Sequence, residues 1–460
     1  MKKILYVLAL ILVFSYVLLS CNSSDLPKET TPEVTTPEET TPEETTPEET
    51  TPEEIILTTP GLAYEVNDDG ETCTITGIGT CTESDISIGG YIDGYKIIGI
   101  SEYAFCECYN LTSVTIGDFA TTIGEGAFLY CFSLTRLTIG NSVITIGESA
   151  FGECKSLMSV TIPNSVTTIG NFAFAYCSNL TSVTISDSVT TIGDGAFYNC
   201  SNLTSVRIPD SVTTIGNATF AACFSLTGII VDQNNTVYQS INGNLYSKDG
   251  TVLVAYVSGK TDTNFVIPDF VTTIGESAFG ECEILMSVTI PNSVTTIGDH
   301  AFEECSNLTT VTIPDSVTAI GVQAFCECDS LTSVIIGDSV ISIDRYAFYK
   351  CFNLTSVIIG DSVTSIGYGA FSDCSNLTSV MIPDSVTTIG DYAFSFCHDL
   401  TSITIPDSVT TIGNSAFYGC GNLTDVYYTG SEAEWAQIEI GDSNSKLTNA
   451  TIHYNYVPEE

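Results

Sequence analysis

The chain has 460 residues, of which 55 are acidic and 12 basic, so its formal net charge is −43. Nucleic-acid binding and attraction to anionic lipid headgroups both need clustered Lys and Arg, which twelve scattered cations do not supply. A hydrophobic content of 43% excludes a chain that is disordered throughout, and the presence of only three His residues argues against a His-based enzyme or zinc site.

Residues 1–20 have the pattern of an export signal. Two lysines precede an apolar run that closes in Leu-Leu-Ser-Cys21. This ending resembles the bacterial lipoprotein signal, which implies that the chain is cut before Cys21 and that the Cys21 thiol takes a lipid. The alternative is an ordinary signal peptide with a chance cysteine. We expect an exported protein, lipid-anchored at the bacterial cell surface and touching the membrane only through that anchor.

Residues 21–54 form a low-complexity segment. Prolines recur every five residues from Pro32 to Pro52 in a TTPEE motif, and almost nothing in the segment is apolar. Proline fixes φ and the glutamates repel one another, so the segment has too little apolar surface to fold. We expect an extended, disordered tether that carries the folded part of the chain away from the membrane.

A 23-residue period organises most of the remaining sequence. It runs through residues 97–228 and 267–426, with residues 55–96 expected to form an N-terminal β-cap. Thirteen copies are marked by a phenylalanine at the same position: Phe105, Phe128, Phe151, Phe174, Phe197, Phe220, Phe279, Phe302, Phe325, Phe348, Phe371, Phe394 and Phe417. A fixed period in the twenties indicates a solenoid, in which each coil packs only on its neighbours.

Each position of the repeat has a physical interpretation. The segment Leu203–Ile208 reads L-x-x-V-x-I, which predicts a short strand with alternate side chains facing inward. A second short strand is expected at Val212–Ile215. The Ala196–Cys200 segment, Ala-Phe-x-x-Cys, is interpreted as one helical turn with its phenylalanine in the core.

The repeat resembles the BspA-like, or Treponema-type, leucine-rich repeat family. The matching stretch is C-S-N-L-T-S-V-T-I-P-D-S-V-T-T-I-G-D-x-A-F, present with small changes at 305–325, and the resemblance covers residues 97–428. It implies a solenoid with parallel strands and an exposed role in adhesion to host proteins, other cells or glycans. The expected fold is a β-rich α/β solenoid, an array of thirteen 23-residue leucine-rich repeat coils with caps at both ends.

Two segments depart from the period. Residues 229–266 are expected to insert a β-hairpin around the turn at Asp249-Gly250, either as a structural elaboration or as a protruding ligand loop. Residues 427–460 are expected to form the C-terminal cap, with Trp435 filling its interior.

Thirteen of the eighteen cysteines occupy one position of the repeat, from Cys108 to Cys420. Identical positions in stacked coils lie about 4.8 Å apart with parallel Cβ vectors, which does not suit a disulfide. We therefore expect a buried row of free thiols. Cys73 and Cys81 could form a disulfide across a hairpin, or remain free.

The sequence contains no catalytic motif, and we expect neither an enzyme nor a cofactor. Aspartates recur at one turn of five successive coils, where they either form the turn or hold Ca²⁺. We favour the turn and expect no metal site. These residues are Asp315, Asp338, Asp361, Asp384 and Asp407.

The expected function is an adhesin-like, monomeric binding protein that recognises proteins or glycans on a host or neighbouring cell, and that binds no nucleic acid. The alternative is a structural cell-envelope protein without a specific ligand. Positions that vary between repeats, and aromatic side chains beside the Ala-Phe-x-x-Cys segment, are the candidate ligand contacts, although the aromatic side chains could equally pack between coils. The candidates are Arg136, Met158, Tyr176, Tyr198, Arg207, Tyr349 and Tyr392.

Overall fold

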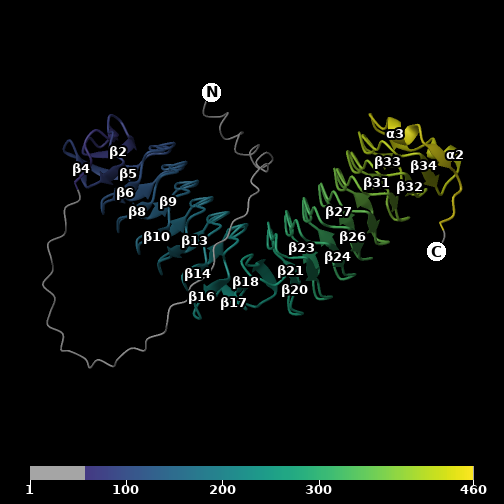
Figure 1. Ribbon diagram of the computed structural model, residues 1–460, viewed down its shortest axis with the longest axis horizontal. Coiled ribbons are helices and arrows are strands. Elements are labelled where there is room, and N and C mark those ends of the chain that lie inside the picture. Colours follow the sequence, from purple (N-terminus) through teal and green to yellow (C-terminus); the bar gives the residue numbers. More distant parts are fainter. Residues whose placement is uncertain (1–56, 459–460) are drawn as a thin grey trace, which may run out of the picture. The chain divides into compact units, whose positions relative to one another are not determined.

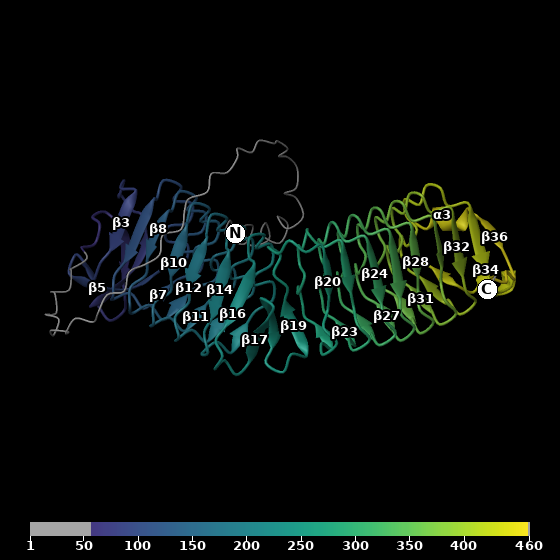
Figure 2. The same cartoon turned by 60° about the horizontal axis from the view of Figure 1, so that its bottom comes forward.

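The computed structural model describes residues 57–458, so the expected signal peptide, Cys21 and the tether lie outside the described residues. The described part belongs to one unit, Ile55–Glu460. It is a parallel β-solenoid of about 17 turns, with coils of about 23 residues that follow one another in chain order (Figure 1, Figure 2). The expected solenoid is confirmed.

The L-x-x-V-x-I segments form one side of the solenoid, which we call the long-strand face. Its strands pair in parallel with identical positions opposed, such as Thr312 with Ile335. Four sheets make up this face: β3 (Asp85–Ile88), β6 (Ser113–Ile116) and β8 (Arg136–Thr138); β10 (Ser159–Thr161), β12 (Ser182–Thr184), β14 (Ser205–Ile208) and β16 (Gly228–Val231); β20 (Asn264–Val266), β22 (Ser287–Thr289), β24 (Thr310–Ile313), β26 (Ser333–Ile336) and β28 (Ser356–Ile358); β30 (Ser379–Met381), β32 (Ser402–Ile405), β34 (Asp425–Tyr428) and β36 (Thr451–His453).

The Val-x-x-Ile segments form a second side, the short-strand face, together with strands of the N-terminal cap and the insertion. Two sheets make up this face: β1 (Ala63–Val66), β2 (Thr72–Gly77), β4 (Tyr91–Ile92), β5 (Tyr95–Ile100), β7 (Thr122–Ile123), β9 (Thr145–Ile146), β11 (Thr168–Ile169), β13 (Thr191–Ile192) and β15 (Thr214–Ile215); β17 (Tyr238–Ile241), β18 (Asn244–Ser247), β19 (Val252–Ala255), β21 (Thr273–Ile274), β23 (Thr296–Ile297), β25 (Ala319–Ile320), β27 (Ser342–Ile343), β29 (Ser365–Ile366), β31 (Thr388–Ile389), β33 (Thr411–Ile412) and β35 (Glu439–Ile440).

Outward threonines add side-chain bonds to the backbone ladder on both faces. The Thr309 hydroxyl donates to the carbonyl of Met286 (3.0 Å), and the Thr332 hydroxyl donates to that of Thr309 (3.1 Å). On the short-strand face the Thr318 hydroxyl donates to the carbonyl of Thr295 (3.3 Å). Threonine therefore connects successive coils as well as presenting a polar surface.

The Ala-Phe-x-x-Cys segments form the third side, the turn side, and here the expected helical turn is wrong. The Cys200 N–H donates to the carbonyl of Phe197 three residues back, whereas the Phe197 N–H donates to Thr219 in the next coil. N–H groups alternate between these two uses, so i to i−4 helical bonds do not form. Positive φ values four residues apart, 55° at Gly195 and 52° at Asn199, bend the chain into successive turns.

Phenylalanine rings stack through the centre of the solenoid. Phe279, Phe302 and Phe325 are fully buried, with centroids 4.6 and 4.9 Å apart and planes within 9° of parallel. The same contact recurs along the array. Because each ring contacts the coil before and the coil after, the core is continuous although no coil has a core of its own.

The insertion divides this core in two. Phe220 ends the first stack, and Tyr256, 5.2 Å from Phe279, begins the second. Strands β18 and β19 are antiparallel, as expected for a hairpin, but β17 adds a third strand and β19 pairs in parallel with β21. The insertion thus supplies the first strands of the second short-strand sheet.

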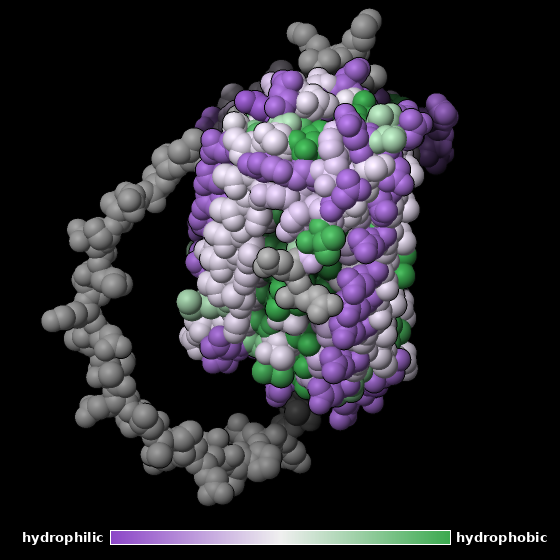
Figure 3. Space-filling view, turned by 90° about the vertical axis from the view of Figure 1, so that its right-hand side faces the viewer, coloured by the Kyte–Doolittle hydropathy of each residue, from purple (hydrophilic) through white to green (hydrophobic). Residues whose placement is uncertain are grey.

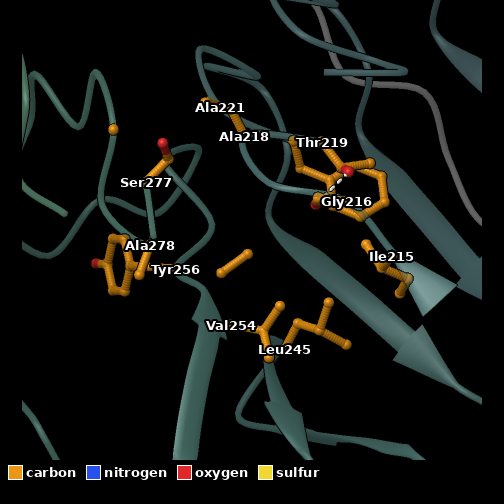
Figure 4. Close-up of a pocket in the computed structure, with 13 residues that line it drawn as sticks. Ile215, Gly216, Ala218, Thr219, Ala221, Leu245, Val254, Tyr256, Ser277 and Ala278 are labelled. Carbon is orange, nitrogen blue, oxygen red and sulfur yellow. Dashed lines mark hydrogen bonds between the residues drawn. The ribbon is translucent and has the colours of Figure 1, made fainter. Parts of the chain in front are cut away.

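A small cavity of about 10 Å³ lies where the two stacks meet. Leu245 and Val254 of the insertion line it together with Ile215 and Thr219 of the preceding coil (Figure 4). This volume suits about one water molecule and excludes an organic ligand.

Both ends of the array are covered by non-repeat elements. At the N-terminal end, Thr59 exchanges hydrogen bonds with Ser87 along the outer edge of β3 (2.8 Å each). At the C-terminal end lie the helices α2 (Glu432–Trp435) and α3 (Ser445–Thr448), with the half-buried Trp435 against Tyr428 (5.1 Å). These segments limit the exposure of open strand edges and apolar coil ends.

Candidate functional site

A groove of about 640 Å³ lies on the long-strand face over β22, β24, β26 and β28. Its floor and walls come from outward strand residues, such as Thr312 and Ile335, and from the turns that follow the strands, such as Asp315 and Asp338. This volume falls within the range of ligand-binding clefts, about 300–1,000 Å³.

Apolar side chains run along this face where most coils carry threonine. Ile335, Ile358 and Met381 occupy the same outward position in three successive coils and are 44, 61 and 52% exposed. Ile335 lies opposite Ile358 in the parallel register. An exposed apolar row of this kind on a polar solenoid is a candidate interaction surface.

A row of aspartates borders the groove at the ends of the strands. The Asp338 N–H donates to Oδ1 of Asp315 (3.1 Å), and the Asp361 N–H donates to Oδ1 of Asp338 (3.3 Å). All three side chains remain exposed. Figure 3, which views the right-hand side of Figure 1, shows apolar residues between a pale column and a strongly hydrophilic column.

Three expected ligand contacts lie on the long-strand face but outside this groove. Met158 is 57% exposed beside β10, and Arg136 on β8 is 3.7 Å from the carboxylate of Asp85. Arg207 on β14 pairs with two carboxylates, Asp187 and Asp232, at 2.8 Å each. The hydrogen bonds from these carboxylates raise the pKa of Arg207 further. Its charge is thus already neutralised within the protein.

Two other expected contacts, Tyr176 and Tyr198, are half-buried on the turn side. Their rings meet edge to face at 5.3 Å. The Tyr198 hydroxyl donates to the carboxylate of Glu281, 83 residues later in the chain. Burial and the neighbouring Glu281 raise the pKa of Tyr198 strongly and that of Tyr176 to about 12. The hydrogen bond between Tyr198 and Glu281 connects the coils before the insertion with the coils after it.

The last two expected contacts, Tyr349 and Tyr392, belong to a run of four tyrosines on the turn side. Successive rings in the order Tyr349, Tyr346, Tyr368 and Tyr392 lie 5.1, 5.2 and 5.3 Å apart. Tyr392 is 38% exposed. The seven expected contacts therefore form three separate groups, and the structure does not bring them into one site.

Carboxylates also gather on the turn side, in the row Glu281, Glu304 and Glu327. Burial, together with the charges of Glu281 and Glu327, raises the pKa of Glu304 to about 8. Lys350 in the next coil pairs with Glu327 at 2.7 Å. Nowhere in the described part of the chain do three His, Cys, Asp or Glu side chains form a group that could hold a metal ion.

The repeated cysteines form a row of free thiols, as expected, and every cysteine of residues 57–458 is free. Cys73 and Cys81 form no disulfide: Cys73 is buried in the core, while Cys81 lies in a turn. The Cys81 N–H donates to the carbonyl of Ile78, three residues earlier (3.0 Å). The Cys108 N–H donates in the same way to the carbonyl of Phe105 (3.1 Å), so Cys81 is the equivalent of Cys108 in the cap.

Sequence variation between repeats singles out Met381 on the strands, but the sequence analysis does not identify Ile335 and Ile358, although a signal for them is present. In Val334-Ile335-Ile336 the outer two residues are buried and Ile335 points outward. Strand alternation alone assigns this orientation. The unusual feature is isoleucine at a position that holds threonine in other coils, such as Thr312 and Thr404.

The stacked parallel coils, with their Leu-x-x-Val-x-Ile strands, define a leucine-rich repeat solenoid. The chain belongs to the family described as the BspA type leucine rich repeat region, whose model matches six times within residues 98–227, 256–378 and 320–446.

Solved structures of bacterial leucine-rich repeat proteins are similar to this chain. A leucine rich cell surface protein from Faecalibacterium prausnitzii shares 32% identity over 84% of this chain and 98% of its own, with a TM-score of 0.53. A protein from Bacteroides ovatus has 27% identity over 86% and 99%, with a TM-score of 0.52. One from Eubacterium ventriosum has 26% identity over 80% and 94%, with a TM-score of 0.59.

Among curated proteins, none matches this sequence. Within residues 57–458, no helix has the length and apolar character that a membrane crossing requires.

Proposed function

We propose that this protein is an exported, lipid-anchored surface protein that binds proteins or glycans of a host or neighbouring cell, and that the groove on its long-strand face is the binding surface. The observation that carries the proposal is the juxtaposition of the exposed apolar row (Ile335, Ile358 and Met381) with the row of exposed aspartates. Apolar and charged groups together on one hollowed surface are typical of protein recognition.

The family and its relatives support an exposed location. The similar Faecalibacterium protein is a cell surface protein by its description. The lipoprotein-like ending at Cys21 and the TTPEE segment suit attachment to a membrane with the solenoid held away from it.

The function is tested with the purified protein on arrays of glycans and matrix proteins, and by adhesion of coated beads to cells. We expect specific binding that decreases when Ile335, Ile358 and Met381 are all replaced by threonine. An intact, folded protein that binds no array component and no cell would favour a structural role in the cell envelope.

The anchor is tested separately by Cys21→Ser. We expect the variant to leave the membrane fraction and appear in the medium or the soluble fraction. Detergent partitioning equal to that of the unmodified chain would show that Cys21 is not the attachment point.

A further inference from the structure

The apolar row has a regular geometry. Ile335, Ile358 and Met381 are one coil apart, so their side chains repeat at about 4.8 Å along the solenoid axis. The three side chains therefore span about 10 Å along the axis. A ligand lying along the axis must present apolar groups at nearly this interval.

Two common polypeptide conformations differ in whether they match this spacing. An α-helix lying along the groove advances about 5.4 Å per turn. Its side chains on three successive turns therefore stay within about 1.2 Å of the positions of the three apolar side chains along the axis. An extended strand presents same-side residues about 6.7 Å apart, so its second side chain no longer lies opposite the apolar side chain of the second coil. The spacing therefore favours a helix with apolar residues at i, i+3 or i+4, and i+7.

The two flanks of the row differ in charge. The aspartates 315, 338 and 361 follow the strands on one side, and no Lys or Arg of residues 57–458 forms an ion pair with them. On the other side lie the neutral hydroxyls of Ser333 and Ser356, two residues before Ile335 and Ile358 on the same strands. A helix in this groove would meet carboxylates along one flank and neutral groups along the other.

We propose that the groove binds a cationic amphipathic α-helix of a partner protein, oriented along the solenoid axis. The apolar stripe of this helix lies on Ile335 and Ile358 of the groove and on Met381 of the next coil, and its Lys or Arg residues lie on the side of the aspartate row. This proposal rests on the proposed function and specifies the partner. Apolar contacts provide most of the affinity in such helix-in-groove complexes, and the charges set the orientation.

The test uses the full chain and a fluorescent synthetic peptide of about 18 residues, with leucines at helical spacing and lysines along one flank. Binding is measured by fluorescence anisotropy at two salt concentrations. Because the protein is strongly acidic, any cationic peptide will bind weakly by charge. Two control peptides separate this effect: one of identical composition with two prolines in the centre, and one with glutamate in place of lysine.

The matched variants use residues that the repeat itself carries at the same positions. Ile335→Thr, Ile358→Thr and Met381→Thr are combined, since Thr312 and Thr404 occupy this row elsewhere. Ile341→Thr is the control, because Ile341 is 51% exposed on the short-strand face, outside the groove. Asp315→Asn, Asp338→Asn and Asp361→Asn are combined in a third protein, since Asn164 and Asn292 form the same turn.

We expect the helical peptide to bind at least about tenfold more tightly than its proline control, and the triple threonine variant to lose about tenfold in affinity. The control Ile341→Thr should bind normally. The asparagine variant should lose the part of the salt dependence by which the helical peptide exceeds its proline control. Circular dichroism of each variant verifies the fold. Equal binding of the helical and proline peptides, or full binding to the threonine variant, would overturn the proposal. Retained binding to cells or array components in that case would leave the proposed function standing with a different partner chemistry.

Discussion

The thiol of Cys305 donates a hydrogen bond to the carbonyl oxygen of Phe279, 3.2 Å away in the preceding coil. The same oxygen also accepts the N–H of Cys282 at 3.0 Å. Eleven such bonds between a cysteine and the phenylalanine 26 residues earlier recur at 3.0 to 3.4 Å. The cysteine position is therefore a small apolar group that also satisfies a buried carbonyl.

This arrangement predicts which thiols react in the folded protein. Of the seventeen cysteines in residues 57–458, fourteen are buried, and Cys81, Cys106 and Cys108 are half-buried. Burial raises the pKa of Cys106 to about 11, and the reactive thiolate is correspondingly scarce. With brief iodoacetamide treatment we expect slow labelling at these three sites and none at Cys305, followed by complete labelling in denaturant. Mass spectrometry showing disulfides between successive row cysteines would contradict the account.

The phenylalanine stack predicts a large stability difference between core and surface aromatics. Phe302→Ala removes a fully buried ring that contacts two others, and we expect a loss of about 3–5 kcal/mol. Phe396→Ala, at a ring that is 37% exposed on the turn side, should cost about 1 kcal/mol or less. Urea midpoints followed by circular dichroism compare the two variants. Similar losses would mean that the stack is not the main source of stability.

The repeat was readable from the sequence because each coil repeats the same chemistry. Alternation within Leu203–Ile208 determines which side chains enter the core, and the 23-residue spacing of the phenylalanines predicts their stacking. The turn at Ala196–Cys200 was misassigned, because its spacing suits a helical turn as well as a series of β-turns. Whether the segment forms a helical turn or β-turns depends on N–H groups that donate to carbonyls of the next coil. The Phe197 N–H is one of these, and the local sequence does not specify its partner.

The candidate site was less predictable. Tyr176 and Tyr198 are aromatic residues beside a turn in the sequence, but they become half-buried because Glu281, beyond the insertion, packs on them. Cys81 lies 27 residues before Cys108, outside the repeat period, so its equivalence to the row appears only in the folded cap. Contacts across an irregular insertion or cap do not follow from the period.

The carboxylate row on the turn side predicts that stability falls between mildly acidic and alkaline pH. The pKa of Glu304 is raised above its unfolded value to about 8, so the folded chain retains a proton that the unfolded chain has lost. The stabilisation is complete below about pH 4 and is lost as pH rises toward 8. Glu304→Gln should remove this loss. Because the side chain is partly exposed, we expect a gain of only about 1–2 kcal/mol at pH 8.

The measurement compares urea midpoints of Glu304→Gln and the unmodified chain at pH 5 and pH 8. Glu83→Gln, at an exposed carboxylate in the N-terminal cap, is the control and should leave the pH dependence unchanged. An unmodified chain that is more stable at pH 8 than at pH 5, with Glu304→Gln showing the same trend, would contradict the account of this row.

Deleting whole repeats shows whether ligands bind in the long-strand groove. Removing residues 280–371 takes out four 23-residue units, with β22, β24, β26 and β28, and joins coils in register. Removing residues 106–197 takes out four units that carry Arg136, Met158 and Tyr176, and serves as the matched control. Both proteins should keep the circular dichroism spectrum of a solenoid, since each coil packs only on its neighbours. We expect the first deletion to abolish binding to cells and array ligands and the second to retain it. Binding kept by the first and lost by the second would show that ligands do not bind in the long-strand groove.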